Sequence, residues 1–163
     1  MKINYKLVLF FMSLILIIGI FTSITLSNNQ DHKFIELQMR YNEGLEYFNN
    51  KEYENAYNSL NQIVDEFPDS EPVNYLYAIS AVNTFHFKES LIYMERALDI
   101  NPYNVENPVF MIQYAEILIN ADKIEEAKLV IEHSKNLEQP TNFPNFQERL
   151  KELEEIVKKG TLI

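Results

Sequence analysis

A repeat with a period of 34 residues constrains this chain more than any other feature of its sequence. Residues 37–70 align with residues 71–104, and a third copy runs from residue 108 to about residue 140 after a three-residue insertion. Equivalent places carry similar residues, pairing Tyr53 with Phe87, Ala56 with Ser90, Leu60 with Met94, Ile63 with Ala97 and Pro68 with Pro102. Such a period is typical of solenoids, in which one supersecondary unit stacks on the next.

Each copy has helical periodicity with breaks at regular intervals, which predicts helices separated by short turns. Pro68 and Pro102 follow the second helices, which end there because proline lacks the N–H and restricts the residue before it. Asn107 before Pro108 is a typical helix start. Small residues recur where the helices of a pair should touch: Ala56, Ser90 and Ala127 opposite Gly44, Ala78 and Ala115.

A further helix is predicted at residues 145–159. Its apolar residues recur at spacings of four, three and four, and the opposite face carries Glu, Lys and Arg; the apolar positions are Phe146, Leu150, Leu153 and Val157. Such an amphipathic helix would cap the exposed end of the stack, as the end of a repeat array requires.

These repeats are similar to the tetratricopeptide repeat family, whose unit is a pair of antiparallel helices. In the first copy the resemblance rests on Gly44, Tyr47, Tyr53, Ala56, Leu60 and Pro68. The turn glycine common in the family is replaced by Lys51, Phe85 and Asp122. The resemblance implies an all-α domain at residues 31–163, with three pairs stacked as a right-handed superhelix and a C-terminal capping helix.

In this family the first helix of each pair lines a concave groove that receives a peptide or helix. Carried onto this chain by register, the groove residues are Tyr41, Leu45, Phe48 and Asn49, then Tyr75, Ile79, Val82 and Asn83, then Ile112, Glu116, Ile119 and Asn120. The alternative for the apolar residues is core packing, and for the three asparagines a left-handed position at a helix end. A family subclass that grips a chaperone-tail carboxylate needs Lys, Asn and Arg where this chain has Tyr41, Leu45, Leu76, Val109 and Gln113, so that ligand is not implied.

The amino-terminal 30 residues differ from the repeats. Residues 7–27 are uncharged and apolar, and as a helix they would span about 31 Å, the thickness of a bilayer core. We expect an uncleaved single-pass anchor with the amino terminus in the cytoplasm and the repeat domain on the extracytoplasmic side. The alternative is a cleaved signal and a secreted repeat protein.

Composition argues against several classes of function. Residues 1–30 contain Lys2 and Lys6 and no acid, so residues 31–163 carry 12 basic and 24 acidic side chains. Such a charge repels nucleic acid. There is no Cys, and His32, His86 and His133 lack metal-ligand spacing. We therefore expect no enzymatic activity, no cofactor and no metal.

The remaining hypotheses concern binding. The first is a membrane-tethered interaction module that holds an apolar or helical segment of a partner protein in its groove. The alternative is a structural subunit of a larger membrane-associated assembly, or a scaffold that self-associates.

Overall fold

The computed structural model describes residues 12, 15–16, 18, 32–141 and 143–160. The chain divides into two units, residues 1–39 and residues 40–163. In the first unit, residues 32–39 are helical.

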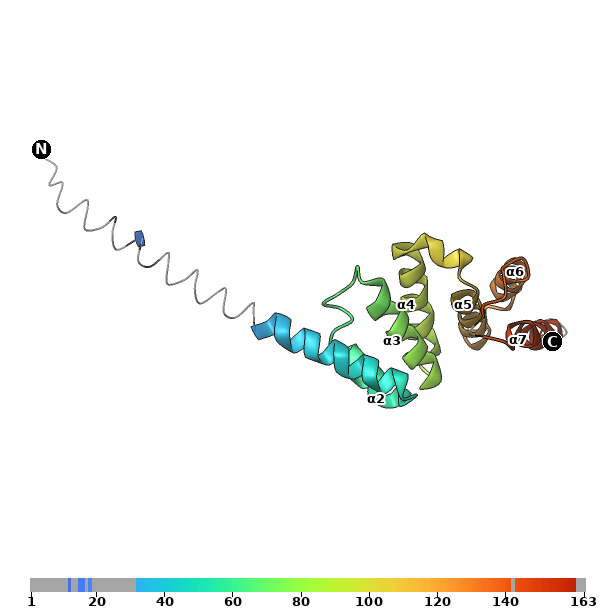
Figure 1. Ribbon diagram of the computed structural model, residues 1–163, viewed down its shortest axis with the longest axis horizontal. Coiled ribbons are helices and arrows are strands. Elements are labelled where there is room, and N and C mark those ends of the chain that lie inside the picture. Colours follow the sequence, from blue (N-terminus) through green and yellow to red (C-terminus); the bar gives the residue numbers. More distant parts are fainter. Residues whose placement is uncertain (1–11, 13–14, 17, 19–31, 142, 161–163) are drawn as a thin grey trace, which may run out of the picture. The chain divides into compact units, whose positions relative to one another are not determined.

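The described part of the second unit contains helices and no strand, which confirms the predicted all-α class (Figure 1). Residues 40–49 are helical and precede α2, Tyr53–Asn61. The helices α3, Glu71–Asn83, and α4, Phe87–Ile100, form the next pair. A short 3-10 helix, Pro102–Glu106, leads to α5, Pro108–Asn120, and α6, Ile124–Ser134. The last helix, α7, is Phe146–Gly160.

The helices of each pair approach closely at the small residues. Ala78 and Ser90 are fully buried, and the Ser90 hydroxyl donates a 2.8 Å hydrogen bond to the Ala78 carbonyl. At Gly44, the side chains nearest to the place of a Cβ are those of Leu60 and Ser59. The absent Gly44 side chain therefore makes room for Leu60.

The contacts between pairs repeat along the unit. α5 contacts both α3 and α4 of the preceding pair, and α7 contacts both α5 and α6 in the same way. The apolar face predicted for the last helix is buried, with Phe146, Leu150, Leu153 and Val157 at most 3% exposed and packed on α5 and α6. Helix α7 thus continues the row of first helices formed by α3 and α5.

The starts of α5 and α3 differ in detail. The Asn107 side chain accepts hydrogen bonds from the backbone N–H groups of Val109 and Phe110, at 3.0 and 3.3 Å. Ser70 precedes α3 but makes no capping bond through its side chain. Only the first start is therefore stabilised by a side-chain cap.

The predicted membrane location is contradicted. In the ranges that the structure describes, no helix is both long and apolar enough to cross a membrane. The helices α2 to α7 have 9 to 15 residues, or about 14 to 23 Å at 1.5 Å per residue, whereas a bilayer core is about 30 Å thick. The predicted span, residues 7–27, lies almost wholly outside the described residues. The prediction of a single-pass membrane protein with an extracytoplasmic repeat domain is therefore wrong.

Candidate functional site

A cleft of about 380 Å³ lies along the row formed by α3, α5 and α7. Five predicted groove residues line it together with three residues of α7: Val82, Asn83, Glu116, Ile119, Asn120, Arg149, Leu153 and Ile156. Among the apolar residues of the cleft, Ile156 of α7 is the most accessible, at 44% exposed. Leu153 of the same helix is only 1% exposed. The cleft therefore offers a ligand both polar groups and apolar side chains at the place where three helices meet.

An ion pair holds the α7 wall against α5. The Arg149 guanidinium Nε lies 2.6 Å from Glu116 Oε1, and its Nη1 lies 2.7 Å from Glu152 Oε2. Both Arg149 and Glu116 are half-buried. Two carboxylates around one guanidinium leave this end of the cleft slightly acidic.

Two asparagines supply the polar part of the cleft. The amide of Asn83 donates a 2.7 Å hydrogen bond to the Ile79 carbonyl, and that of Asn120 donates a 2.8 Å bond to the Glu116 carbonyl. Each bond fixes the side chain while leaving its oxygen and its second N–H for another partner. Among the described residues, positive φ angles occur at Lys51, Phe85 and Asp122, so the asparagines do not take the left-handed position considered from the sequence.

Three other predicted groove residues pack between helices. Ile79 and Ile112 are 5% and 2% exposed and belong to the core clusters. The Tyr75 ring stacks on Phe110 with 5.6 Å between centroids, and its hydroxyl donates a 2.5 Å bond to Gln113 Oε1. Burial raises the pKa of Tyr75. These side chains join α3 to α5 and leave little surface for a ligand.

The four predicted residues of the first copy do not line this cleft. Tyr41, Leu45 and Phe48 are half-buried and Asn49 is exposed. The Phe48 ring makes an edge contact with Tyr53 at 5.9 Å and packs against the core around α3 and α4. The cleft is therefore confined to the second and third copies and α7.

Sequence reasoning missed the contribution of α7. Arg149, Leu153 and Ile156 are spaced by four and three residues, which places them on one stripe of a helix beside the core-facing stripe. Treating the capping helix as the next first helix of the array would have extended the groove onto this stripe.

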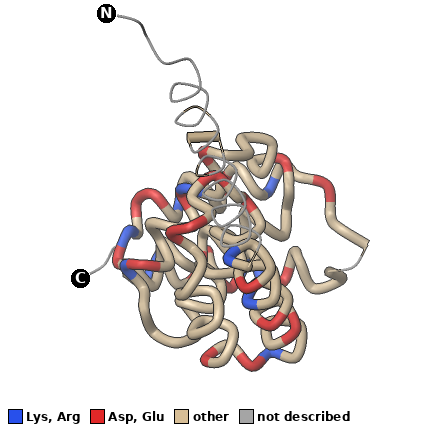
Figure 2. Tube along the Cα trace, turned by 90° about the vertical axis from the view of Figure 1, so that its left-hand side faces the viewer, with Lys and Arg blue, Asp and Glu red and all other residues tan. Residues whose placement is uncertain are grey.

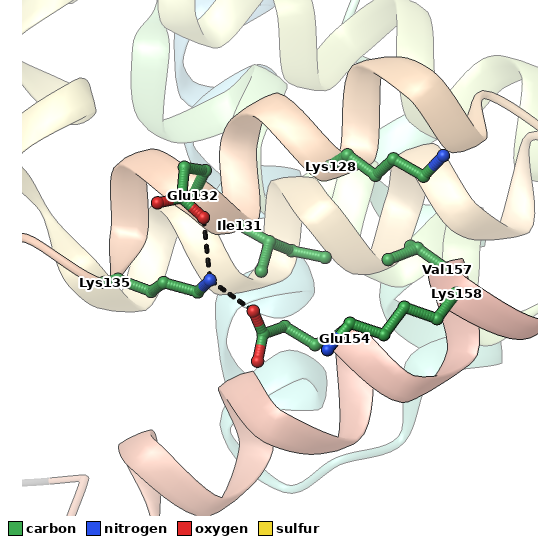
Figure 3. Close-up of a pocket in the computed structure, with 7 residues that line it drawn as sticks. All are labelled: Lys128, Ile131, Glu132, Lys135, Glu154, Val157 and Lys158. Atoms are coloured by element: carbon green, nitrogen blue, oxygen red, sulfur yellow. Dashed lines mark hydrogen bonds and ion pairs between the residues drawn. The ribbon is translucent and has the colours of Figure 1, made fainter.

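A second cavity, of about 340 Å³, lies between α6 and α7 (Figure 3). Three lysines line it, but Lys135 is held between the carboxylates of Glu132 and Glu154. The hydrogen bond from Lys135 lowers the pKa of Glu154. Lys128 is likewise 2.6 Å from Glu125. The Lys135–Glu154 pair fastens α7 to the end of α6, and the carboxylates paired with these lysines oppose binding of a further anion.

Acidic side chains predominate on the part of the chain that the structure describes. Figure 2 shows acidic residues spread along the helices, with basic residues less frequent between them. In the described ranges, no group of three or more His, Asp or Glu side chains could hold a metal ion. The cleft combines exposed apolar side chains with fixed hydrogen-bonding groups.

Comparison with known proteins identifies the repeat. Residues 37–70 match the family model described as a tetratricopeptide repeat. No curated protein matches the sequence significantly.

Solved structures share the fold at low sequence identity. The TPR2B domain of yeast Sti1, in complex with an Hsp70 peptide, has a TM-score of 0.59 and 17% identity, covering 77% of this chain and 98% of that one. The type III secretion translocator chaperone SycD of Yersinia enterocolitica has a TM-score of 0.62 and 13% identity, covering 78% and 86%. Its complex with a peptide of the translocator YopD has a TM-score of 0.55 and 14% identity, covering 77% and 92%.

The family match and the shared fold lead to the same conclusion. This chain contains a tetratricopeptide repeat at residues 37–70, and its structure has the fold of tetratricopeptide-repeat domains.

Proposed function

We propose that this chain is a protein-interaction module that binds an extended, apolar segment of a partner protein in the cleft between α3, α5 and α7. The observation that carries the proposal is the lining of the cleft. Val82, Ile119 and Ile156 present accessible apolar surface around the almost fully buried Leu153. An apolar side chain of the partner would be desolvated there.

The two asparagines favour an extended segment over a helix. Asn83 and Asn120 each keep an acceptor and a donor for a ligand. An extended chain has free backbone N–H and C=O groups that match them, whereas a helix satisfies these groups internally except at its ends. The apolar wall and the amides together suit a segment that inserts side chains and pairs its backbone.

The structural neighbours support this choice. Two of them are complexes, the yeast domain with an Hsp70 peptide and SycD with a peptide of YopD. Tyr41, Leu45, Leu76, Val109 and Gln113 replace the Lys, Asn and Arg that the chaperone-tail subclass needs. We therefore favour an internal apolar segment over a terminal carboxylate as the ligand.

The test is selection of ligands from a displayed library of random peptides. Ile156→Asp should weaken binding of the selected peptides at least tenfold, because it places a charge on the apolar wall. Asn83→Ala should weaken binding several-fold. Lys151→Asp is the matched control, since Lys151 is exposed on α7 and lies outside the cleft.

The control should leave the affinity within twofold of wild type. If Ile156→Asp binds as tightly as Lys151→Asp, the cleft is not the binding site. If the selected peptides bind as helices, the preference for an extended ligand is wrong while the site stands.

A further inference from the structure

The turns inside the three helix pairs share one backbone conformation. Lys51, Phe85 and Asp122 occupy the same place in successive copies and have φ angles of 62°, 66° and 62°. In each turn the N–H of this residue donates to the carbonyl three residues back, and the next N–H donates to the carbonyl five residues back. This pattern ends a helix through a left-handed residue, which is why glycine suits the place.

Phe85 is the least suitable of the three residues for this conformation. Asp is tolerated in the left-handed region, whereas a bulky aromatic residue is an outlier there. Its ring is 81% exposed, so burial does not compensate for the unfavourable backbone. An unfavourable backbone conformation under an exposed aromatic ring points to a functional contact.

The exposed ring borders an open depression of about 370 Å³, lined by Phe85, His86, Phe87, Lys88 and Glu89. The Phe85 and Phe87 rings meet edge to face, with centroids 6.0 Å apart and planes at 85°. The depression thus presents two aromatic side chains beside one basic and one acidic side chain.

The wall of the depression is held in place from below. The His86 ring stacks on Tyr57 with centroids 4.3 Å apart. Glu89 Oε2 accepts hydrogen bonds from the hydroxyls of Tyr57 and Tyr77, at 2.7 and 3.1 Å. A surface fixed in this way loses little conformational freedom when a partner binds.

Charge decides which partner suits this surface. Residues 31–163 carry 12 basic and 24 acidic side chains, so two copies of the chain, or the chain and a nucleic acid, repel each other. A basic segment is attracted. At the depression, Glu89 lies beside Lys88 in the lining, and Glu54 precedes Tyr57 by three residues on the same face of α2.

We propose that the turn between α3 and α4 is a second interaction surface, on which the Phe85 and Phe87 rings bind an aromatic side chain carried by a basic segment of a partner protein. The two rings offer an edge and a face to a third ring, an arrangement that aromatic groups prefer. The contact lies outside the cleft and does not depend on it.

Substitution by glycine separates binding from folding at this turn. Phe85→Gly in the full chain should relieve the left-handed strain and raise Tm by a few degrees, about 2 to 5 °C. It should also weaken binding of a fluorescein-labelled peptide of alternating Lys and Phe at least tenfold. Lys51→Gly and Asp122→Gly change the same backbone position in the other copies, and both should leave the affinity within twofold of wild type.

Two further variants and two altered probes test whether the Phe85 ring and the charge of the peptide determine binding. Phe85→Asn, which also tolerates the left-handed region, should lose binding as the glycine variant does. Ile156→Asp should bind the probe like wild type, because that residue lies in the cleft. Probes with Glu in place of Lys, or with Ser in place of Phe, should bind at least tenfold more weakly.

Several results would overturn the inference. These are absence of probe binding to wild type at millimolar concentration, unchanged affinity in Phe85→Gly or Phe85→Asn, and equal binding of the acidic probe. A fall in the Tm of Phe85→Gly would show that the ring serves the fold, and loss of probe binding in Ile156→Asp would place the probe in the cleft.

Discussion

Gly44 allows a direct test of how closely the first two helices pack. A Cβ added there would lie 2.8 Å from Leu60 Cγ and 2.9 Å from Leu60 Cδ2. Carbon atoms in contact prefer separations of about 3.5 to 4.0 Å. Leu60 is fully buried, so its side chain has no empty space into which it could move.

The expected cost combines two opposing effects. Overpacking by one methyl group costs about 1 to 3 kcal/mol. Ala is about 1 kcal/mol better than Gly inside a helix, and Gly44 lies in the helical residues 40–49. We therefore expect Gly44→Ala to lower the free energy of unfolding by about 1 kcal/mol.

The effect of Gly44→Ala on the free energy of unfolding should change sign when Leu60 is truncated to alanine. Leu60→Ala alone should cost about 2 to 5 kcal/mol because it leaves a cavity beside Gly44. In that background Gly44→Ala fills part of the cavity and gains helix propensity, so it should stabilise by about 1 kcal/mol. The cycle is measured by urea denaturation of the four proteins, with equal m values as the check on two-state unfolding.

A coupling energy between Gly44→Ala and Leu60→Ala below about 0.5 kcal/mol would refute the reasoning, because distant, independent sites show couplings of that size. Gly160→Ala is a control, since its added Cβ would lie 3.6 Å or more from the nearest Ile124 atoms. That distance is an ordinary contact, and we expect no loss of stability.

Three further predictions follow from the fold. Tyr75→Phe should lower stability by about 0.5 to 1.5 kcal/mol because the hydrogen bond to Gln113 is lost. Tyr75→Ala should cost about 2 to 4 kcal/mol because the ring stacked on Phe110 is lost as well. Equal effects of the two substitutions in thermal melts would contradict this. Asn107→Ala should cost about 1 kcal/mol in denaturant titrations, and Ser70→Ala clearly less, because only Asn107 makes a side-chain cap. Burial raises the pKa of Tyr114 to about 12 from an ordinary value of 10.0. Its neutral form therefore contributes stability that is fully present below pH 10 and is lost as the pH rises towards 12, and Tyr114→Phe should lose less stability than wild type over this window.

The helices were predictable because the signals that place them are local or repeat at a fixed interval. Pro108 after Asn107 marked the start of α5, and the apolar spacing from Phe146 to Val157 marked α7. The repeat register also identified the turn positions of Lys51, Phe85 and Asp122, which share one left-handed conformation.

Part of the site escaped prediction because groove and core lie one helical step apart. The repeat register predicted that both Ile79 and Val82 line the groove, but Ile79 is buried and only Val82 of the two lines the cleft. The wall supplied by Ile156 depends on how α7 packs against α5, which is a contact between segments far apart in the sequence.

The binding site is most directly tested by an NMR titration of the full chain with a peptide selected from the displayed library. With labelled isoleucine methyl groups and side-chain amides, we expect the signals of Ile119, Ile156, Asn83 and Asn120 to shift together and saturate at the same peptide concentration. Shifts confined to residues outside the cleft, such as the exposed Ile92 of α4, would contradict the proposed site.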